Sequence, residues 1–419
     1  MILNYTNNSM FLIIMVGLPG RGKSSISKKI CNYFNWIGYN TQIFNAGNLR
    51  RQKPQGFNFF SEECKTYRDS ISYEQFDNLL NWISKNQGEN TVGIFDATNT
   101  TLQRRTKLLN LVENFKPLVN LKVIFIESCI ENENLIQKNM LTKKKSLDYI
   151  NKSEQEFLED FKSRVEYYES IYTKISFDEN VNFIRSTIKV NNKKLIESYV
   201  DDSILFTTRY NILFNQINYI LNNTIINKPV IYLSRHGQSE YNTLKRIGGD
   251  SSLSLLGKNY PEKLANYIND QIGDNYHVFT STLKRCKETA DNLNKNKFHS
   301  IKELDEINAG IFNHYTYEEI EEDFKEEFIK RKEDKLNYRY PMGESYVDII
   351  NRLRHIILKI ESHNIPTVVV SHQATLRVIY AYFMKIKRED IPRLEIPLHT
   401  VIKLIPDGDN YKTEKIELM

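Results

Sequence analysis

The chain has 419 residues, of which 40% are hydrophobic and 26% are charged, and its formal net charge is +5. This length suits two domains, and the composition is typical of a soluble globular protein. No apolar run is long enough to span a membrane, and the mild positive charge fits anionic small substrates better than nucleic acid. The cysteines lack paired or metal-type spacing, which indicates a reducing cytosol.

The first half alternates short apolar runs with amphipathic segments. The apolar runs predict buried strands at 11–16, 41–44, 92–95 and 121–126, and helical spacing occurs at 24–36, 73–84 and 101–112. This alternation predicts a doubly wound, mainly parallel sheet with ligands at the carboxyl ends of its strands. After a helix at 210–221, the polar stretch 222–229 predicts a boundary between domains at 1–225 and 226–419.

The second half restarts this pattern. Strands predicted at 230–233 and 367–370 are each followed by a histidine, so one sheet edge can hold both His236 and His372. All the histidines lie at or beyond His236, so the first half cannot use a histidine acid or base. The charge-rich stretch 320–335 predicts one solvated helix.

A glycine-rich loop, Gly17-Leu18-Pro19-Gly20-Arg21-Gly22-Lys23-Ser24, follows the first strand and opens a helix. In such a loop, backbone N–H groups and the helix N-terminus bind phosphate oxygens. Lys23 would reach the β- and γ-phosphates of ATP, and Ser24 would bind Mg²⁺. Asp96, at the end of the strand at 92–95, suits a second Mg²⁺-organising carboxylate, although it could also be only a helix cap.

The triplet Arg235-His236-Gly237 opens the second half. A neutral imidazole can attack phosphorus and hold it as phosphohistidine, and an adjacent arginine can neutralise the phosphoryl oxygens. The triplet alone is a weak signal, but it is followed by Thr280-Ser281-x-x-Lys284-Arg285, Glu306-Ile307-x-Ala309-Gly310 and Ser371-His372-Gln373-Ala374. One chain with both patterns predicts a kinase joined to a phosphatase.

Over nearly its whole length, the chain resembles the 6-phosphofructo-2-kinase/fructose-2,6-bisphosphatase family. The string Phe95-Asp96-Ala97-Thr98-Asn99-Thr100-Thr101 is its most specific part. The resemblance implies a P-loop α/β domain followed by a three-layer, phosphoglycerate-mutase-like histidine phosphatase domain. It also implies a cytoplasmic homodimer, joined through the kinase half, that makes fructose 2,6-bisphosphate from ATP and fructose 6-phosphate and hydrolyses it again.

The resemblance assigns roles in the kinase half. The MgATP site would comprise Gly17, Gly20, Arg21, Gly22, Lys23, Ser24, Ser25 and Asn139, with the metal held by Ser24 and Asp96. Lys144 would lie near the transferring phosphate, although the lysine run at 143–145 appears one residue short, so either neighbour could replace it. Fructose 6-phosphate would be bound by Arg51, Thr98, Arg104, Arg164 and Tyr168.

The resemblance also assigns roles in the phosphatase half. His236 would be the nucleophile, and Glu306 would be the general acid and then the base. The phosphate clamp would be formed by His372, Arg235 and Arg285. The sugar and its other phosphate would be bound by Asn242, Gly248, Tyr317, Arg331, Lys335, Gln373 and Arg377.

The chain departs from the family pattern in several places: the pattern has acidic residues where Asn48 and Asn308 stand, and a cysteine one position after Cys129. One half could therefore be degenerate, leaving only a kinase or only a phosphatase. Another kinase–phosphatase fusion, acting on nucleic acid ends, would need a basic stripe with interleaved aromatics, whereas lysines here are mixed with acids. We expect structural or surface roles for His277, His299, His314, His355, His363 and His399.

Overall fold

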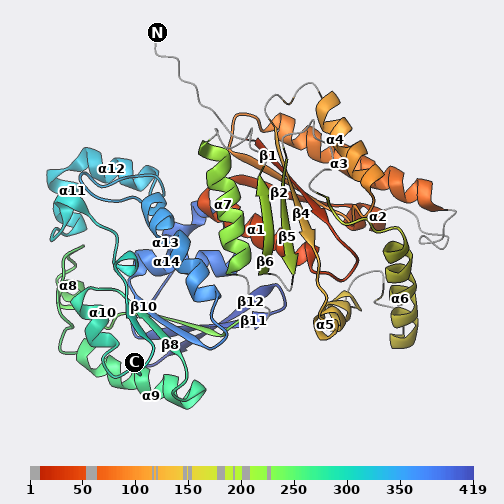
Figure 1. Ribbon diagram of the computed structural model, residues 1–419. Helices are drawn as coiled ribbons and strands as arrows, with labels where there is room; N and C mark the ends of the chain where they lie inside the picture. Colours follow the sequence, from red (N-terminus) through yellow and green to blue (C-terminus); the bar gives the residue numbers. More distant parts are fainter. Residues whose placement is uncertain are drawn as a thin grey trace, which may run out of the picture. The chain divides into compact units, whose positions relative to one another are not determined.

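The computed structural model describes residues 10–52, 64–115, 118, 121–144, 149, 153–176, 185–191, 194–200, 208–223 and 228–419. The chain divides into two compact units, Met1–Ile226 and Asn227–Met419. Each unit contains a six-stranded sheet with helices packed around it (Figure 1). The predicted α/β class is therefore confirmed.

The sheet of the first unit has the strand order β2-β3-β1-β4-β5-β6. Its parallel strands are β1 (Met10–Val16), β2 (Asn40–Asn45), β3 (Thr91–Asp96), β4 (Lys122–Ser128) and β5 (Arg185–Asn191), and β6 (Lys194–Val200) is antiparallel to β5. The helices are α1 (Lys23–Ile37), α2 (Ala46–Arg51), α3 (Lys65–Lys85), α4 (Leu102–Asn114), α5 (Glu133–Lys144), α6 (Glu154–Ser170) and α7 (Thr208–Asn222).

Strand β1 lies in the middle of this sheet and is completely buried. Alternate residues such as Leu12 and Ile14 share a core with Phe76 and Leu79 of α3 and with Leu108 of α4. Because side chains alternate between the faces of a strand, the intervening residues of β1 point to the other face. Burial on both faces explains why β1 is a continuous apolar run, and it fixes where the glycine-rich loop begins.

The sheet of the second unit has the order β12-β11-β7-β10-β8-β9. Strands β7 (Ile231–Arg235), β10 (Thr367–Ser371), β8 (His277–Thr280) and β9 (Phe298–Ser300) are parallel, and β11 (Thr400–Asp407) and β12 (Asn410–Glu417) form an antiparallel edge. The helices are α8 (Glu240–Thr243), α9 (Tyr260–Ile272), α10 (Lys284–Thr289), α11 (Tyr317–Asp323), α12 (Lys325–Glu333), α13 (Tyr346–Glu361) and α14 (Gln373–Met384).

The prediction of one helix over 320–335 was wrong. The chain breaks between α11 and α12 at Phe324, which has the non-helical angles φ −136° and ψ 50°. The ring of Phe324 packs edge-on against Phe312, with centroids 5.0 Å apart, in a small cluster that also contains Ile320. Burying this aromatic ring therefore takes precedence over continuing the helix.

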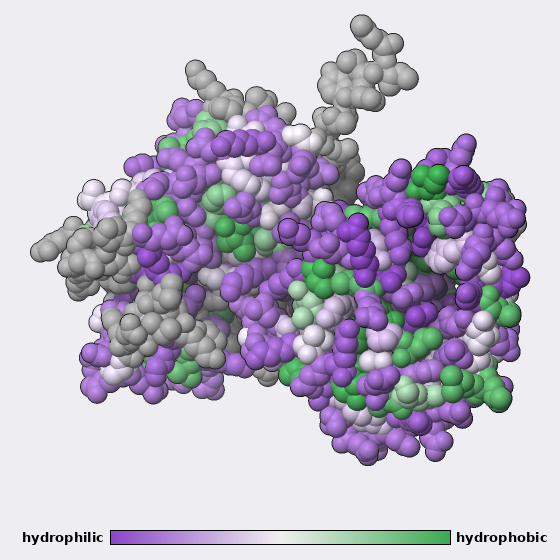
Figure 2. All heavy atoms as spheres, turned by 180° about the vertical axis from the view of Figure 1, so that it is seen from behind, coloured by the Kyte–Doolittle hydropathy of each residue, from purple (hydrophilic) through white to green (hydrophobic). Residues whose placement is uncertain are grey.

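The molecular surface is mainly hydrophilic on the face drawn in Figure 2, where apolar side chains occur in scattered groups. Within the described part of the chain, no helix combines the length and the apolar character needed to cross a membrane.

Candidate active sites

The glycine-rich loop leaves β1 through a conformation that only glycine adopts easily. Gly17 has φ +134°, and a Cβ atom there would lie 2.5 Å from the Ser128 carbonyl oxygen at the end of β4. Its N–H donates to the Thr98 carbonyl, 2.9 Å away, so the loop is tied to the segment after β3. Farther along, Asn139 donates through Nδ2 to the Gly20 carbonyl at 2.9 Å. These contacts hold the loop at the carboxyl edge of the sheet.

Lys23 is buried at the start of α1. Its Nζ donates to the carbonyls of Gly17 and Leu18, each 2.7 Å away. Burial lowers the pKa of Lys23 to about 7, and the charge of Asp96 opposes this shift. Burial makes the charged form of Lys23 unfavourable, and a phosphate anion bound beside it would stabilise that form. Lys23 therefore fits a phosphate-binding site.

Asp96 is buried at the carboxyl end of β3 and accepts a hydrogen bond from Asn45 Nδ2 at 2.6 Å. Helix α4 is instead capped by Thr101, whose side chain accepts from the Arg104 N–H, so Asp96 is not its cap. The described residues contain no group of three metal-ligating side chains.

The arginines expected to bind sugar phosphate are held by neighbours. Arg104 donates through Nη1 to Asp69 at 2.6 Å and through Nε to Asn99 at 3.1 Å. Arg51 donates to the Asn48 side chain. Asn48 thus keeps an acceptor for Arg51 where the family pattern has an acid. Asp69 carries no motif, and only the structure reveals its pairing with Arg104.

The structure distinguishes the lysines at the end of α5. Lys144 pairs with Glu154, 3.4 Å away. Lys143 keeps contact with solvent, yet desolvation lowers its pKa, the charge of Asp96 opposes this shift, and Arg164 adds to it. Lys143 therefore shares the electrostatic environment of Asp96 and Arg164, whereas Lys144 lies in an ion pair. Lys145 lies outside the described residues.

In the second unit, adjacent parallel strands bring two histidines together. Arg235 of β7 is in register with Ser371 of β10, and the N–H of His236 donates to the Ser371 carbonyl at 3.0 Å. The rings of His236 and His372 consequently lie with centroids 5.1 Å apart. Both histidines are buried.

The hydrogen bonds of His236 define its tautomer. Nδ1 lies 2.7 Å from the Gly237 carbonyl, which can only accept, so Nδ1 carries the proton. Nε2 accepts from Arg285 Nε at 3.2 Å. Burial, with the charges of Arg235 and Arg285, holds the pKa of His236 well below its usual value. The ring is thus neutral, with an unprotonated Nε2 beside a guanidinium.

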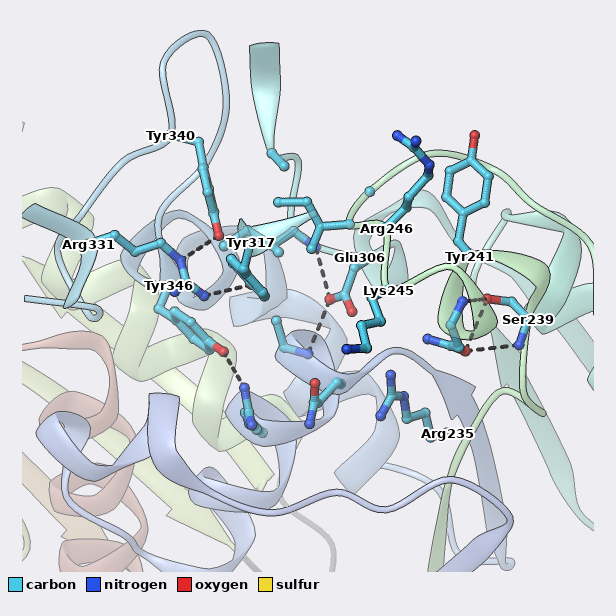
Figure 3. Close-up of a pocket in the computed structure, with 18 of the residues that line it drawn as sticks. Arg235, Ser239, Tyr241, Lys245, Arg246, Glu306, Tyr317, Arg331, Tyr340 and Tyr346 are labelled. Carbon is cyan, nitrogen blue, oxygen red and sulfur yellow. Dashed lines mark hydrogen bonds between the residues drawn. The ribbon is translucent and has the colours of Figure 1, made fainter. Parts of the chain in front are cut away.

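His236 lies in a cavity of about 510 Å³ (Figure 3). Glu306 is on its wall and accepts through Oε1 from the N–H groups of Ile307 and Ala374, at 3.0 and 3.1 Å. His372 is not among the lining residues but lies behind them, whereas the other predicted phosphatase residues do line the cavity. The basic side chains on the wall are Arg235, Lys245, Arg246, Arg285, Arg331, Lys335 and Arg377, and the acidic ones are Glu306 and Glu318.

Tyrosine hydroxyls bind the side chains of Arg331 and Arg377 at the far side of this cavity, as Figure 3 shows for Arg331. Arg331 donates to the hydroxyls of Tyr340 and Tyr317 at 2.6 and 2.7 Å. Burial, with the charges of Arg331 and Arg377, lowers the pKa of Lys335 to about 8. Such a cluster of cations fits a ligand with a second anionic group.

Asn308, the neutral departure near Glu306, is exposed and is not part of the cavity wall. Its side-chain oxygen accepts from the Gly310 N–H at 2.9 Å and from Asn313 Nδ2 at 3.1 Å. The substitution therefore removes a charge from the turn after Glu306, while the wall of the cavity keeps its own charges.

Comparison with known proteins identifies the two halves. Residues 1–220 match the 6-phosphofructo-2-kinase family, and residues 231–418 match the histidine phosphatase superfamily (branch 1). A 6-phosphofructo-2-kinase/fructose-2,6-bisphosphatase of Aquarana catesbeiana is 38% identical over 98% of this chain and 85% of its own length. This chain belongs to that family. The human 6-phosphofructo-2-kinase/fructose-2,6-bisphosphatase 1 is 39% identical over the same shares.

This member of the 6-phosphofructo-2-kinase/fructose-2,6-bisphosphatase family is thus a bifunctional enzyme with a kinase half and a phosphatase half. A kinase half implies a nucleotide as the phosphoryl donor. Among solved structures, the alpha-ribazole phosphatase of Shigella flexneri covers 44% of this chain and 94% of its own, with 20% identity and a TM-score of 0.40.

Proposed function

We propose that this enzyme makes fructose 2,6-bisphosphate from MgATP and fructose 6-phosphate in its first half and hydrolyses it through a phosphohistidine in its second. The observation that carries the proposal is the cavity of the second unit. It combines a neutral His236 with basic groups at both the nucleophile and the far side, as a sugar carrying two phosphates requires.

In the phosphatase half, Nε2 of His236 attacks the phosphorus of the 2-phosphate as the bond to the sugar oxygen breaks. Glu306 gives its proton to that oxygen, and Arg235 and Arg285 neutralise the phosphoryl oxygens. The Glu306 carboxylate then takes a proton from water, whose oxygen attacks the phosphohistidine and releases phosphate. The other end of the substrate is bound by Asn242, Gly248, Tyr317, Arg331, Lys335, Gln373 and Arg377.

In the kinase half, the ATP phosphates lie on the loop of Gly17, Gly20, Arg21, Gly22, Lys23, Ser24 and Ser25, with Asn139 beside it. Asp96 accepts the proton of the sugar 2-hydroxyl as that oxygen attacks the γ-phosphorus, while the bond from the γ-phosphorus to the bridging oxygen breaks and ADP leaves. The 6-phosphate is bound by Arg51, Arg104 and Arg164, with Thr98 and Tyr168 alongside. We assign the lysine near the transferring phosphate to Lys143 rather than Lys144, because Lys144 pairs with Glu154.

Mg²⁺ would be held by Ser24 and Asp96 and would neutralise the negative charge of the nucleotide phosphates. We further propose a kinase domain at 1–225 and a phosphatase domain at 226–419, in a cytoplasmic homodimer joined through the kinase half.

The proposal is tested with the full chain and two reciprocal variants. Wild type, Lys23→Met and His236→Ala are incubated with MgATP and fructose 6-phosphate, and separately with fructose 2,6-bisphosphate. We expect His236→Ala to synthesise without hydrolysing and Lys23→Met to hydrolyse without synthesising. The exposed His355→Ala on α13 serves as the matched control and should keep both activities. Hydrolysis without synthesis in the wild type would mean that the kinase half is degenerate, and absence of both activities would overturn the substrate assignment.

A further inference from the structure

His372 is connected to the carboxylate of Asp305 through the hydroxyl of Ser281, and the proposed mechanism does not use this relay of hydrogen bonds. Nε2 of His372 lies 2.8 Å from the Ser281 hydroxyl, at the end of β8. That hydroxyl donates to Oδ1 of Asp305 at 2.7 Å. His372 and Ser281 have no exposed surface, so no solvent contact competes with these bonds.

The direction of each hydrogen bond follows from the partners. The Asp305 carboxylate also accepts from the Thr282 N–H at 2.7 Å and from the Thr282 hydroxyl at 2.8 Å, so Asp305 acts as the acceptor throughout. The single proton of Ser281 is therefore used on Asp305, and the serine oxygen must accept from its other neighbours. One of these is the Leu283 N–H at 3.1 Å, and another is Nε2 of His372.

Nε2 must therefore carry the proton of the neutral His372 ring, which leaves Nδ1 without one. The Cys286 sulfur lies 3.3 Å from Nε2, but a thiol is a weaker partner than a hydroxyl. Burial and the neighbouring arginines lower the pKa of His372 well below its usual value, so the ring is neutral before substrate binds. The His372 ring lies 5.1 Å from the His236 ring, measured between centroids, so the negative charge of a phosphoryl group bound at His236 would favour the doubly protonated form of His372.

We propose that Asp305, acting through Ser281, is a positioning residue for the phosphatase half that keeps the proton on Nε2 of His372 and stabilises the imidazolium formed when the phosphoryl group binds. The backbone of Asp305 supports this role, because its carbonyl accepts from Thr375 Oγ1 at 2.6 Å and Arg352 Nη2 at 2.8 Å. Asp305 immediately precedes Glu306, so one rigid segment orients both His372 and the proposed acid. The inference rests on the proposed phosphohistidine chemistry.

The first test needs no substrate. In full-length protein labelled with ¹⁵N-histidine, nitrogen chemical shifts and couplings identify the tautomer of each ring, and His372→Asn assigns the signal. We expect the Nε2–H form in the wild type and its loss in Ser281→Ala. Added inorganic phosphate should shift the wild-type ring toward the doubly protonated form. A wild-type ring with the proton on Nδ1 would overturn the proposal.

The second test compares two hydroxyls that bind the same carboxylate. We expect Ser281→Ala and Asp305→Asn to lower kcat for hydrolysis by about 10- to 100-fold, with little change in KM. In both variants the basic limb of the kcat–pH profile should move to lower pH. Thr282→Val, the matched control, should stay within about threefold of wild type, and hydrogen exchange of amides in β8 and β10 reports that the second unit of each variant is folded. An equal loss in Thr282→Val, or an unmoved pH profile, would show that Asp305 only holds the loop.

These outcomes are separable from failure of the proposed substrate. If fructose 2,6-bisphosphate is not hydrolysed, p-nitrophenyl phosphate replaces it in the kinetic test, and the tautomer measurement is unaffected.

Discussion

Three histidines with no part in the proposed chemistry form a stacked cluster in the phosphatase half, and this cluster predicts a pH-dependent stability. The rings of His277 and His363 stack with centroids 3.8 Å apart, and His299 lies 5.7 Å from His277. Burial lowers the pKa of His363 to about 4, and the nearby His277, His299, Lys359 and Lys297 all act in the same direction. Protonating any ring of the cluster therefore opposes folding.

The size of the effect follows from linkage. Because the pKa of His363 in the folded state is below the unperturbed 6.5, the unfolded chain binds the proton more readily, and stability is lost as pH falls from about 6.5 toward 4. If the His363 ring were fully buried, this difference in pKa would lower the free energy of unfolding at pH 5 by about 2 kcal/mol relative to neutral pH. Since this ring is only partly buried, we halve the figure to about 1 kcal/mol, which is about fivefold in the unfolding equilibrium.

We therefore expect His363→Asn to lose about 1 kcal/mol less stability than wild type between pH 7 and pH 5. Urea-dependent hydrogen exchange of amides in β8 and β10 reports on the second unit. The fluorescence of Trp36 and Trp82, which both lie in the first unit, is the internal reference. The exposed His355→Asn is the matched substitution. If His363→Asn loses as much stability on acidification as wild type does, the cluster is not the source of the pH dependence.

Three further predictions concern the two sites. Gly17→Ala should lower kinase kcat/KM by about 100-fold and leave hydrolysis intact, because the new Cβ would lie 2.5 Å from the Ser128 oxygen; unchanged synthesis would contradict the loop geometry. Burial lowers the pKa of Lys335 to about 8, so kcat/KM for hydrolysis should fall by about tenfold as pH rises through that value. Lys335→Arg should remove this pH dependence. If the kcat/KM–pH profiles of wild type and Lys335→Arg are equal, Lys335 does not bind the substrate. Lys143→Met should reduce synthesis by about 100-fold and Lys144→Met only slightly, and the reverse order would restore Lys144 as the active residue.

The sequence predicted what local patterns encode. The buried runs at 11–16 and 367–370 correspond to β1 and β10, because strands buried on both faces are continuously apolar. The glycine-rich loop and His236 were likewise found from residues that are close along the chain.

Features that depend on tertiary contacts were missed. The break at Phe324 depends on an aromatic cluster formed by distant residues. The pairing of Arg104 with Asp69 and the relay from Asp305 to His372 join different elements, so no spacing in the sequence signals them. The partner of Lys144 is likewise a residue of another helix.

The position of β10 in the second sheet affects how the enzyme is made. Since β10 lies between β7 and β8 and is followed directly by His372, the proposed phosphatase site is incomplete until His372 has left the ribosome. Lys23, at the start of α1, and Asp96, at the end of β3, are synthesised long before. At about 5–20 residues per second, the roughly 150 residues from Asn227 to His372 take on the order of 7–30 s. A nascent chain of this enzyme therefore has a period in which phosphoryl transfer could precede hydrolysis.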